Sequence, residues 1–438
     1  MSEPASAAAP SRSLLGTGAL AGAKRRLAAD NAWLLALRVV FGSRLIVWFA
    51  GFAAIAWLGE NVHAFLALDP YGVTSPFNSV PLDKLLAPAG RWDSVWYIEI
   101  AQHGYYSAAS TNFFPLYPLL VAAGDQFVNQ PLLVGMVISF ACMTVAMVVL
   151  YRLALLDFDA RVARLTIVLV SLYPVSFYLS SVYTESLFLM LVVGAFYAAR
   201  RERWMLAGLC GGLCAATRSD GVSLVLPLGL IYLYGPRSVA ATATAGRWWR
   251  PRYRLGRSAA WLALVPAGLG AYLAYLGISH ADPFAPYHAA QVNWGRAFAG
   301  PFVSVFKTIG MVPGDIHRLL AGKGQRVGPG DPLPWNAHDL IDLGFFALAI
   351  AALAASWRRV PFAYLLYAVI LLLYASSFPA PHAPLQALPR YMLPAFPLFI
   401  GVSSRLAGRR WLTRGVLTGS AALLVVFSGL WAIWVLVP

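Results

Sequence analysis

Residues 91–106 read RWDSVWYIEIAQHGYY and stand between two long apolar stretches of the chain. The segment holds three charged side chains, Arg91, Asp93 and Glu99, among five Trp and Tyr residues. Because Trp and Tyr favour the boundary between lipid tails and headgroups, this segment predicts a short helix at a membrane surface, ending at Gly104. The three charged side chains have either a catalytic role or, as the alternative, no role beyond being solvated on an aromatic helix at the interface.

The composition excludes a soluble globular domain. Of 438 residues, 59% are hydrophobic and 12% charged, and the mean hydropathy is +0.66, far from the usual composition of soluble domains. The formal net charge is +15, carried mainly by Arg. Since the arginines form short clusters between apolar spans, we expect them to set membrane topology and not to bind nucleic acid. The preference for Ala, Gly and Arg over Lys predicts a GC-rich bacterial gene.

Motifs for metals, disulfides and nucleotides are missing from the sequence. Cys142, Cys210 and Cys214 lie within apolar runs, so they predict packing and neither a metal site nor a disulfide framework. The sequence contains no Walker motif, no GxGxxG and no serine elbow. It therefore gives no support for ATP-driven activity or for the use of a nucleotide sugar. We therefore expect no cofactor and no obligatory metal.

The apolar runs predict an all-α polytopic membrane protein. A span needs about 20 apolar residues, and about eleven runs qualify, some of them short. Residues 1–32 are expected to be a disordered cytoplasmic N-terminus, and residues 33–437 one transmembrane domain. The piece at 113–123 is too short to span, so it is re-entrant or lengthens the next helix. The predicted spans are 33–58, 130–151, 162–178, 182–199, 204–217, 221–235, 259–279, 339–357, 361–377, 391–405 and 414–437.

The basic clusters predict the orientation. With eleven spans, the Arg and Lys clusters all fall on one side, which the positive-inside rule makes the cytoplasm. The opposite side collects the polar segments that interrupt the spans, and this predicts a site at the outer face of a plasma (inner) membrane. These segments are the extracytoplasmic loops 59–129 and 280–338, the turn at 180–185, residues 217–220 and the Pro-rich turn 379–389.

Two polar groups on that side have a possible chemical role. Asp93 is a candidate general base, because a carboxylate can take a proton from a hydroxyl acceptor; the alternative is that it pairs with Arg91 or caps its helix. Arg218, in the sequence TRSDG, is a candidate for holding a lipid phosphate, and the alternative is a turn pair with Asp220.

Four other charged residues lie at the start of a predicted span or inside one. Glu185 stands at the start of a predicted span, where a carboxylate is stabilised by the helix dipole. Arg390, followed by Tyr391, starts another span and would anchor or snorkel there. Arg38 and Arg44 lie inside the first span, where they either snorkel to the interface or face the bundle.

A set of motifs resembles the PIG-V mannosyltransferase family over about residues 33–405. Any one of the matches is weak, but they stand in the family's order along nearly the whole chain. They are Arg91-Trp92-Asp93 with His103-Gly104-Tyr105, FFPLYP at 113–118, SLYPVSFYLSSVYTESLF at 171–188, AATRSDG at 215–221, Gln291, Trp294-Gly295-Arg296, Pro301 and PRYMLPAFP at 389–397.

The resemblance implies a GT-C glycosyltransferase fold with an acidic residue in the first large outer loop. It implies that Asp93 is the catalytic residue and that the donor is a polyprenyl-phosphate sugar, most simply mannose. Eukaryotic members add the second mannose of the GPI anchor, an acceptor that a bacterium lacks, so the expected acceptor is an extracytoplasmic glycan or glycolipid. The expected substrate-binding residues are Arg91, Trp92, Tyr105, Glu185, Arg218, Asp220, Trp294, Arg296, Arg390 and Tyr391.

Two departures and three rival functions accompany this interpretation. Ser94 replaces the family's usual Gly or Ala, and Asp220 its commoner Asn. A transporter or lipid flippase would share the spans and charges but should show two related halves, and the sequence shows no internal repeat. A glycosyltransferase for another polyprenyl-phosphate sugar, or a catalytically inactive relative acting as a subunit, would show the same sequence features.

Overall fold

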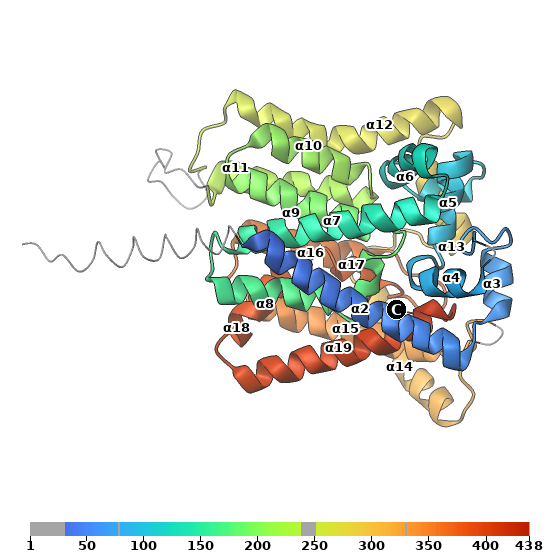
Figure 1. Cartoon of the computed structure of the whole chain (residues 1–438). Helices are drawn as coiled ribbons and strands as arrows, with labels where there is room; N and C mark the ends of the chain where they lie inside the picture. The colour runs from blue at the N-terminus through green and yellow to red at the C-terminus, as the bar shows by residue number, and fades with distance from the viewer. Residues whose placement is uncertain (1–30, 78, 238–250, 329–330, 438) are drawn as a thin grey trace, which may run out of the picture.

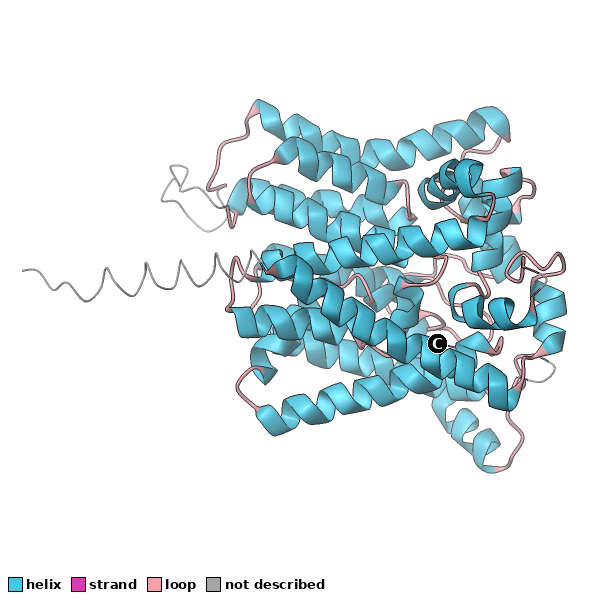
Figure 2. Cartoon of the chain, in the orientation of Figure 1, coloured by secondary structure: helices cyan, strands magenta, loops and turns pink. Residues whose placement is uncertain are grey.

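A computed structural model describes residues 31–77, 79–237, 251–328 and 331–437. Throughout these ranges the chain is helical, and Figure 2 shows helices joined by loops without a strand. Residues 1–30 of the expected disordered N-terminus and the arginines of 238–250 lie outside the described residues, whereas Ala32 already belongs to the first helix.

Eleven helices occupy the positions of the eleven predicted spans. Five helical stretches within the described ranges are long and apolar enough to cross a membrane: α2, α7, α12 with its 3-10 turn (Arg257–Ser279), α15 and α19. The others are shorter, as expected where apolar runs are interrupted. The eleven are α2 (Ala32–Leu58), α7 (Pro131–Ala154), α8 (Ala160–Ser171), α9 (Glu185–Arg200), α10 (Trp204–Ala215), α11 (Val225–Tyr234), α12 (Leu264–Ser279), α15 (Trp335–Ser356), α16 (Phe362–Ser377), α18 (Phe396–Leu406) and α19 (Arg410–Ala432).

The described residues contain seven further α-helices, which lie in the predicted loops or at their edges, and five 3-10 turns. The α-helices are α3 (Val62–Leu68), α4 (Val80–Leu86), α5 (Ser94–His103), α6 (Leu116–Val128), α13 (Ala285–Trp294), α14 (Val303–Leu320) and α17 (Leu388–Met392). The 3-10 turns are η1 (Ala87–Ala89), η2 (Ala109–Asn112), η3 (Ser176–Leu179), η4 (Ser219–Leu224) and η5 (Arg257–Ala263).

A proline shortens one of the predicted spans and leaves polar groups inside the bundle. The run at 162–178 is helical only to Ser171, shortly before Pro174, since proline removes a backbone donor and restricts the residue before it. Arg44, from inside α2, compensates for the break. Its guanidinium donates to the Ser171 carbonyl at 2.9 Å and to the Ser180 hydroxyl at 3.1 Å. Of its two predicted positions, Arg44 therefore takes the one facing the bundle.

The bundle has two chemically different ends (Figure 1). The short helices α3, α4, α5, α6 and α13 gather at one end, drawn on the right, which we call the site end. The described basic loops between α7 and α8, α9 and α10, α15 and α16, and α18 and α19 lie at the opposite end. This separation is the one that the basic clusters predicted.

Close helix packing in the bundle depends on small residues in at least one place. α10 and α12 pack against each other, and a Cβ at Gly268 would lie 1.9 Å from the carbonyl oxygen of Gly212. Only glycine permits this approach, as at other tight contacts between membrane helices. The pair holds α12 against the rest of the bundle.

The helix predicted around Asp93 is present but is shorter and more buried than expected. α5 starts at Ser94, three residues after the predicted start, because Trp92 adopts a left-handed φ of 53°. It ends before Gly104 as predicted. α5 packs against α6 and α7 and buries one face, including Tyr97 and Ile98, within the main core. It is therefore part of the bundle and does not lie flat on its surface.

Candidate active site

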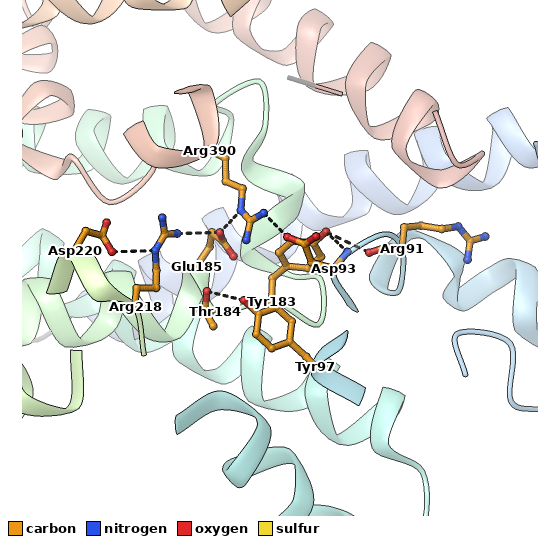
Figure 3. A network of polar contacts seen from close by, with 9 residues as sticks. All are labelled: Arg91, Asp93, Tyr97, Tyr183, Thr184, Glu185, Arg218, Asp220 and Arg390. Carbon is orange, nitrogen blue, oxygen red and sulfur yellow. Dashed lines mark hydrogen bonds and ion pairs between the residues drawn. The ribbon is translucent and has the colours of Figure 1, made fainter. Parts of the chain in front are cut away.

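Five charged side chains form a continuous network at the site end, in which acids and arginines alternate (Figure 3). Arg390 Nη1 donates to Asp93 Oδ2 at 2.6 Å, and Arg390 Nε donates to Glu185 Oε1. Arg218 Nη1 donates to the same Glu185 oxygen at 3.1 Å, and Arg218 Nε donates to Asp220 Oδ1 at 3.2 Å. All five residues were predicted site residues, and the structure brings them together.

Each member of the network stands at the end of a helix or next to one. Asp93 immediately precedes α5, and Glu185 is the first residue of α9. Arg390 lies in the short helix α17, and Arg218 immediately precedes the 3-10 turn η4, which holds Asp220. Four segments far apart in sequence thus meet where their helices begin or end, and this is where the prolines and polar turns interrupt the apolar runs.

Burial differs strongly among the three acids. Glu185 and Asp220 expose 0% and 2% of their side chains, whereas Asp93 exposes 31%. Burial lowers the pKa of Arg390, but Glu185 and Asp93 outweigh this effect and raise that pKa well above its usual range. The arginine therefore remains a cation between two carboxylates.

Asp93 keeps one carboxylate oxygen unoccupied. Its Oδ2 accepts from Arg390, while its Oδ1 has no hydrogen-bond partner among the described residues. Glu185 also has a free oxygen, Oε2, but that atom is buried. A base must reach a hydroxyl that arrives from outside, so exposure favours Asp93 over Glu185 and Asp220.

Two tyrosines that were not predicted complete the site. The backbone N–H of Asp93 donates to Tyr183 Oη at 2.9 Å, and the Tyr183 hydroxyl donates to the Arg91 carbonyl at 3.3 Å. The Arg390 guanidinium lies 4.7 Å from the Tyr183 ring centre and 5.2 Å from that of Tyr178, close enough for cation–π attraction. Both tyrosines belong to the motif at 171–188, which was the signal that could have identified them.

Arg91 and Trp92 flank Asp93 in sequence but have contacts elsewhere. The Arg91 guanidinium points away from the network (Figure 3), pairs with Glu60 at 2.6 Å and donates to the Ala432 carbonyl at 2.9 Å. Its side chain is 1% exposed, and burial lowers its pKa to about 10. The Trp92 ring packs against Trp434 at 6.3 Å. These contacts are structural and give no support to a substrate role for either residue.

The other predicted residues surround the network at different distances. The Tyr391 ring lies 4.9 Å from the Arg218 guanidinium. Arg296 donates to the Gln386 carbonyl at 3.0 Å, in the segment that leads into α17. The structure does not join Tyr105 to the network.

Tyr105 and Trp294 belong to an aromatic layer beside α5. The Tyr105 hydroxyl donates to the Phe113 carbonyl at 2.8 Å, and its ring contacts Tyr272 at 5.7 Å. Trp294 packs against Trp96 at 6.2 Å and Phe113 at 5.9 Å. The layer connects α13 to the motif at 113–118.

The structure also decides between the local alternatives. Asp93 pairs with Arg390 and not with Arg91, and its side chain makes no capping hydrogen bond to α5. The turn pair between Arg218 and Asp220 is present, but Arg218 binds Glu185 as well. In the described part of the chain, no group of three or more His, Cys, Asp or Glu side chains is arranged to hold a metal ion.

Comparison with known proteins points to one family. Residues 36–228 match the family model described as Mannosyltransferase (PIG-V). GPI alpha-1,6-mannosyltransferase 2 of Mus musculus is 26% identical over 275 residues, covering 59% of this chain and 50% of that protein. The Rattus norvegicus protein of the same name is 30% identical over 154 residues, 32% of this chain and 31% of that one. The chain thus spans half or less of the length of these relatives.

The structural comparison is weaker. The apo oligosaccharyltransferase of Archaeoglobus fulgidus is 12% identical, with a TM-score of 0.38, covering 90% of this chain and 55% of that one. This similarity is too low to show a common fold, so the expected GT-C architecture stays a prediction. The expected bacterial origin also stays a prediction. The sequence match is more informative, because residues 36–228 contain Asp93, Glu185, Arg218 and Asp220. Through this segment, the chain is similar to the mannosyltransferase (PIG-V) family.

Proposed function

We propose that this protein transfers a mannosyl residue from polyprenyl-phosphate mannose to an extracytoplasmic glycan or glycolipid. The observation that supports this most directly is the Asp93–Arg390 pair. It combines a partly exposed carboxylate that has a free oxygen with a permanent cation, at the place where four segments distant in sequence meet. A glycosyl transfer from a lipid phosphate needs both a base and a cation.

Asp93 would act as the general base. Its free Oδ1 takes the proton of the acceptor hydroxyl as that oxygen attacks the anomeric carbon of the donor. The bond between the anomeric carbon and the phosphate oxygen breaks, and the phosphate leaves with the electron pair. Attack from the side opposite the leaving group inverts the anomeric carbon, so a β-linked donor gives an α-linked product.

Arg390 and Arg218 would bind the leaving phosphate. The phosphodiester of the donor carries one negative charge, and the monoester that leaves develops a second. Groups that stabilise the developing charge lower the barrier more than groups that bind the donor equally before and during reaction. Arg390 Nη2 has no partner among the described residues, and this donor supports the assignment.

A purified enzyme in lipid nanodiscs tests the donor. We expect it to consume polyprenyl-phosphate mannose, by transfer or by slow hydrolysis, and to leave GDP-mannose intact. The measurement is release of radioactive mannose from the lipid phase. Turnover of GDP-mannose without any lipid-linked sugar would refute the proposed donor.

Introduced cysteines test the proposed orientation. Cys142, Cys210 and Cys214 are free thiols and would first be replaced by Ser. On this background, Ala108→Cys at the site end should react with a membrane-impermeant maleimide in intact cells. Gly408→Cys at the opposite end should react only after permeabilisation, and the reverse pattern would place the site in the cytoplasm.

A further inference from the structure

A cavity lies at the end of the bundle opposite the site end, between two of the basic loops. Its volume is about 420 Å³, within the range of small-ligand sites, about 300–1,000 Å³. One wall is the loop that joins α15 to α16, and Asp157, in the loop between α7 and α8, belongs to the other. Asp157 pairs with Arg200, the last residue of α9, whereas Glu185 is the first. The cavity is therefore separated from the active-site network by the length of α9 (Figure 1).

Two consecutive exposed arginines, Arg358 and Arg359, line this cavity. Arg359 Nη1 donates to the Ser404 carbonyl at 3.2 Å, which ties the loop to the end of α18. The other two nitrogens of Arg359, and the whole Arg358 guanidinium, have no partner among the described residues. The cavity thus offers arginine donors that no carboxylate in the described part of the chain occupies.

The backbone of Arg358 has a conformation that suits glycine better than arginine. Its φ is 60°, in the left-handed region that other residues seldom adopt and glycine enters readily. Residues held in such conformations cluster at ligand sites. The strain at this position therefore favours a function for the Arg358 side chain.

The acidic residue in the wall does not oppose an anion. Both oxygens of Asp157 accept from Arg200, at 2.6 and 2.9 Å. This ion pair has no net charge, so Arg358 and Arg359 determine the sign of the potential in the cavity. The cavity is positive.

Exposed aromatic side chains place the cavity at the level of lipid headgroups. Trp357 and Phe362 both line it and expose 57% and 64% of their surface. Trp411, at the start of α19 and at the same end of the bundle, is exposed as well. Exposed Trp at the ends of membrane helices lies where lipid tails meet headgroups. A group bound between Arg358 and Arg359 would therefore have lipid tails beside it.

We propose that this cavity binds the phosphate of an anionic phospholipid, with Arg358 and Arg359 as donors and the acyl chains against Trp357 and Phe362. Arginine donors match the oxygens of a phosphate, and basic pockets between membrane helices suit anionic headgroups. A free phosphate would use the same donors but not the aromatic side chains, which favour the lipid. This lipid is distinct from donor and acceptor, so the inference does not depend on the proposed function.

Native mass spectrometry of the full-length protein, titrated with phosphatidylglycerol in detergent, tests the inference. We expect saturable binding at a single tightest site, in preference to phosphatidylcholine. Replacing both Arg358 and Arg359 by Gln should weaken that binding about 10-fold to 100-fold, the loss expected when hydrogen bonds to a charged group are removed.

The matched control replaces Arg409 and Arg410 by Gln. These are also consecutive exposed arginines at the same end of the bundle, but they do not line the cavity. The control removes the same charge, so it should leave the affinity of the tightest site nearly unchanged.

Arg358→Gly separates ligand binding from folding. Glycine adopts a φ of 60° without strain, so the melting temperature without lipid should stay close to that of the unmodified protein while the affinity falls. If the double Gln variant does not fold, Arg358→Gly decides the matter.

Three outcomes would overturn the inference. Equal losses in the two double variants would show only the general attraction of a basic protein for anionic lipid. Equal affinity for phosphatidylglycerol and phosphatidylcholine would remove the role of charge. Inorganic phosphate that stabilises the protein in phosphatidylcholine nanodiscs as strongly as phosphatidylglycerol does would assign the cavity to a free anion. None of these measurements involves the mannose donor, so they stand apart from the test of the proposed function.

Discussion

Helix α9 begins in one charged network and ends in another. The two networks differ in whether all of their carboxylate oxygens have hydrogen-bond partners. Glu185, its first residue, accepts from two arginines at the site end. Arg200, its last residue, donates to both oxygens of Asp157 at 2.6 and 2.9 Å and to the Tyr364 hydroxyl at 2.7 Å. About 24 Å of helix separates the two networks, at 1.5 Å per residue.

The pair at the Arg200 end, which we call closed, leaves no carboxylate oxygen free, although the buried Arg200 Nε has no hydrogen-bond partner among the described residues. One acid faces one arginine, and both oxygens of Asp157 are occupied. The network at the Glu185 end is open, because three acids share two arginines and the exposed Asp93 keeps an unoccupied oxygen. A closed ion pair holds helices in place, whereas an open one retains acceptors and donors for a ligand, as groups at functional sites often do.

The largest expected difference between the two networks concerns their aspartates. Asp93→Asn keeps the shape and removes the basic oxygen, so turnover should fall about 10²–10⁴-fold with little change in melting temperature. Asp157→Asn should do the opposite, because it weakens a charged hydrogen-bond pair, at a cost of about 1.5–3 kcal/mol in the free energy of unfolding. Turnover and thermal unfolding measured on both variants test this contrast.

Equal activity in the two variants would contradict the expected difference between the two networks. If Asp93→Asn remained active, the base would have to be Glu185 or Asp220. If Asp157→Asn lost turnover without losing stability, the opposite end would be part of the catalytic apparatus.

The next expected effect concerns the arginines. Arg390 bridges Asp93 and Glu185 with two different nitrogens of one planar group, and a lysine cannot reproduce that fork. Arg390→Lys should therefore lower turnover about 10²–10³-fold, the loss typical of one charge-stabilising donor. Arg200→Lys should lower the melting temperature and leave turnover near that of the unmodified protein, as measured in the same assay.

Much of the fold follows from the sequence because lipid requires long apolar runs. Each of the eleven predicted spans corresponds to a helix, and the basic loops share one end. Their lengths were predicted less well. The run at 162–178 ends as a helix at Ser171, and α15 begins four residues before the predicted residue 339, directly after Pro334.

The partners of the site residues could not be predicted in the same way. Asp93 and Arg390 are 297 positions apart, and no local pattern pairs them before the helices are assembled. The motifs named both residues, but only the fold shows that Arg390 joins Asp93 to Glu185.

The smallest expected effect tests a third carboxylate, Glu99, which lies six residues after Asp93 on α5 but belongs to neither network. Glu99 Oε2 is 3.9 Å from His103 Nε2, and its side chain is 10% exposed. Burial raises the pKa of Glu99, although His103 partly opposes the shift. A carboxyl whose pKa is raised by folding destabilises the folded state when it is ionised. Below the pKa of the unfolded chain, Glu99→Gln should therefore melt like the unmodified protein. As the pH rises through the pKa of the folded state, the variant should become the more stable of the two, and its turnover should stay within about twofold. Melting temperatures measured from pH 4 to pH 8 check the sign. A variant that is less stable at neutral pH would show that Glu99 is held as an anion, and a large loss of turnover would place it in the open network beside Asp93.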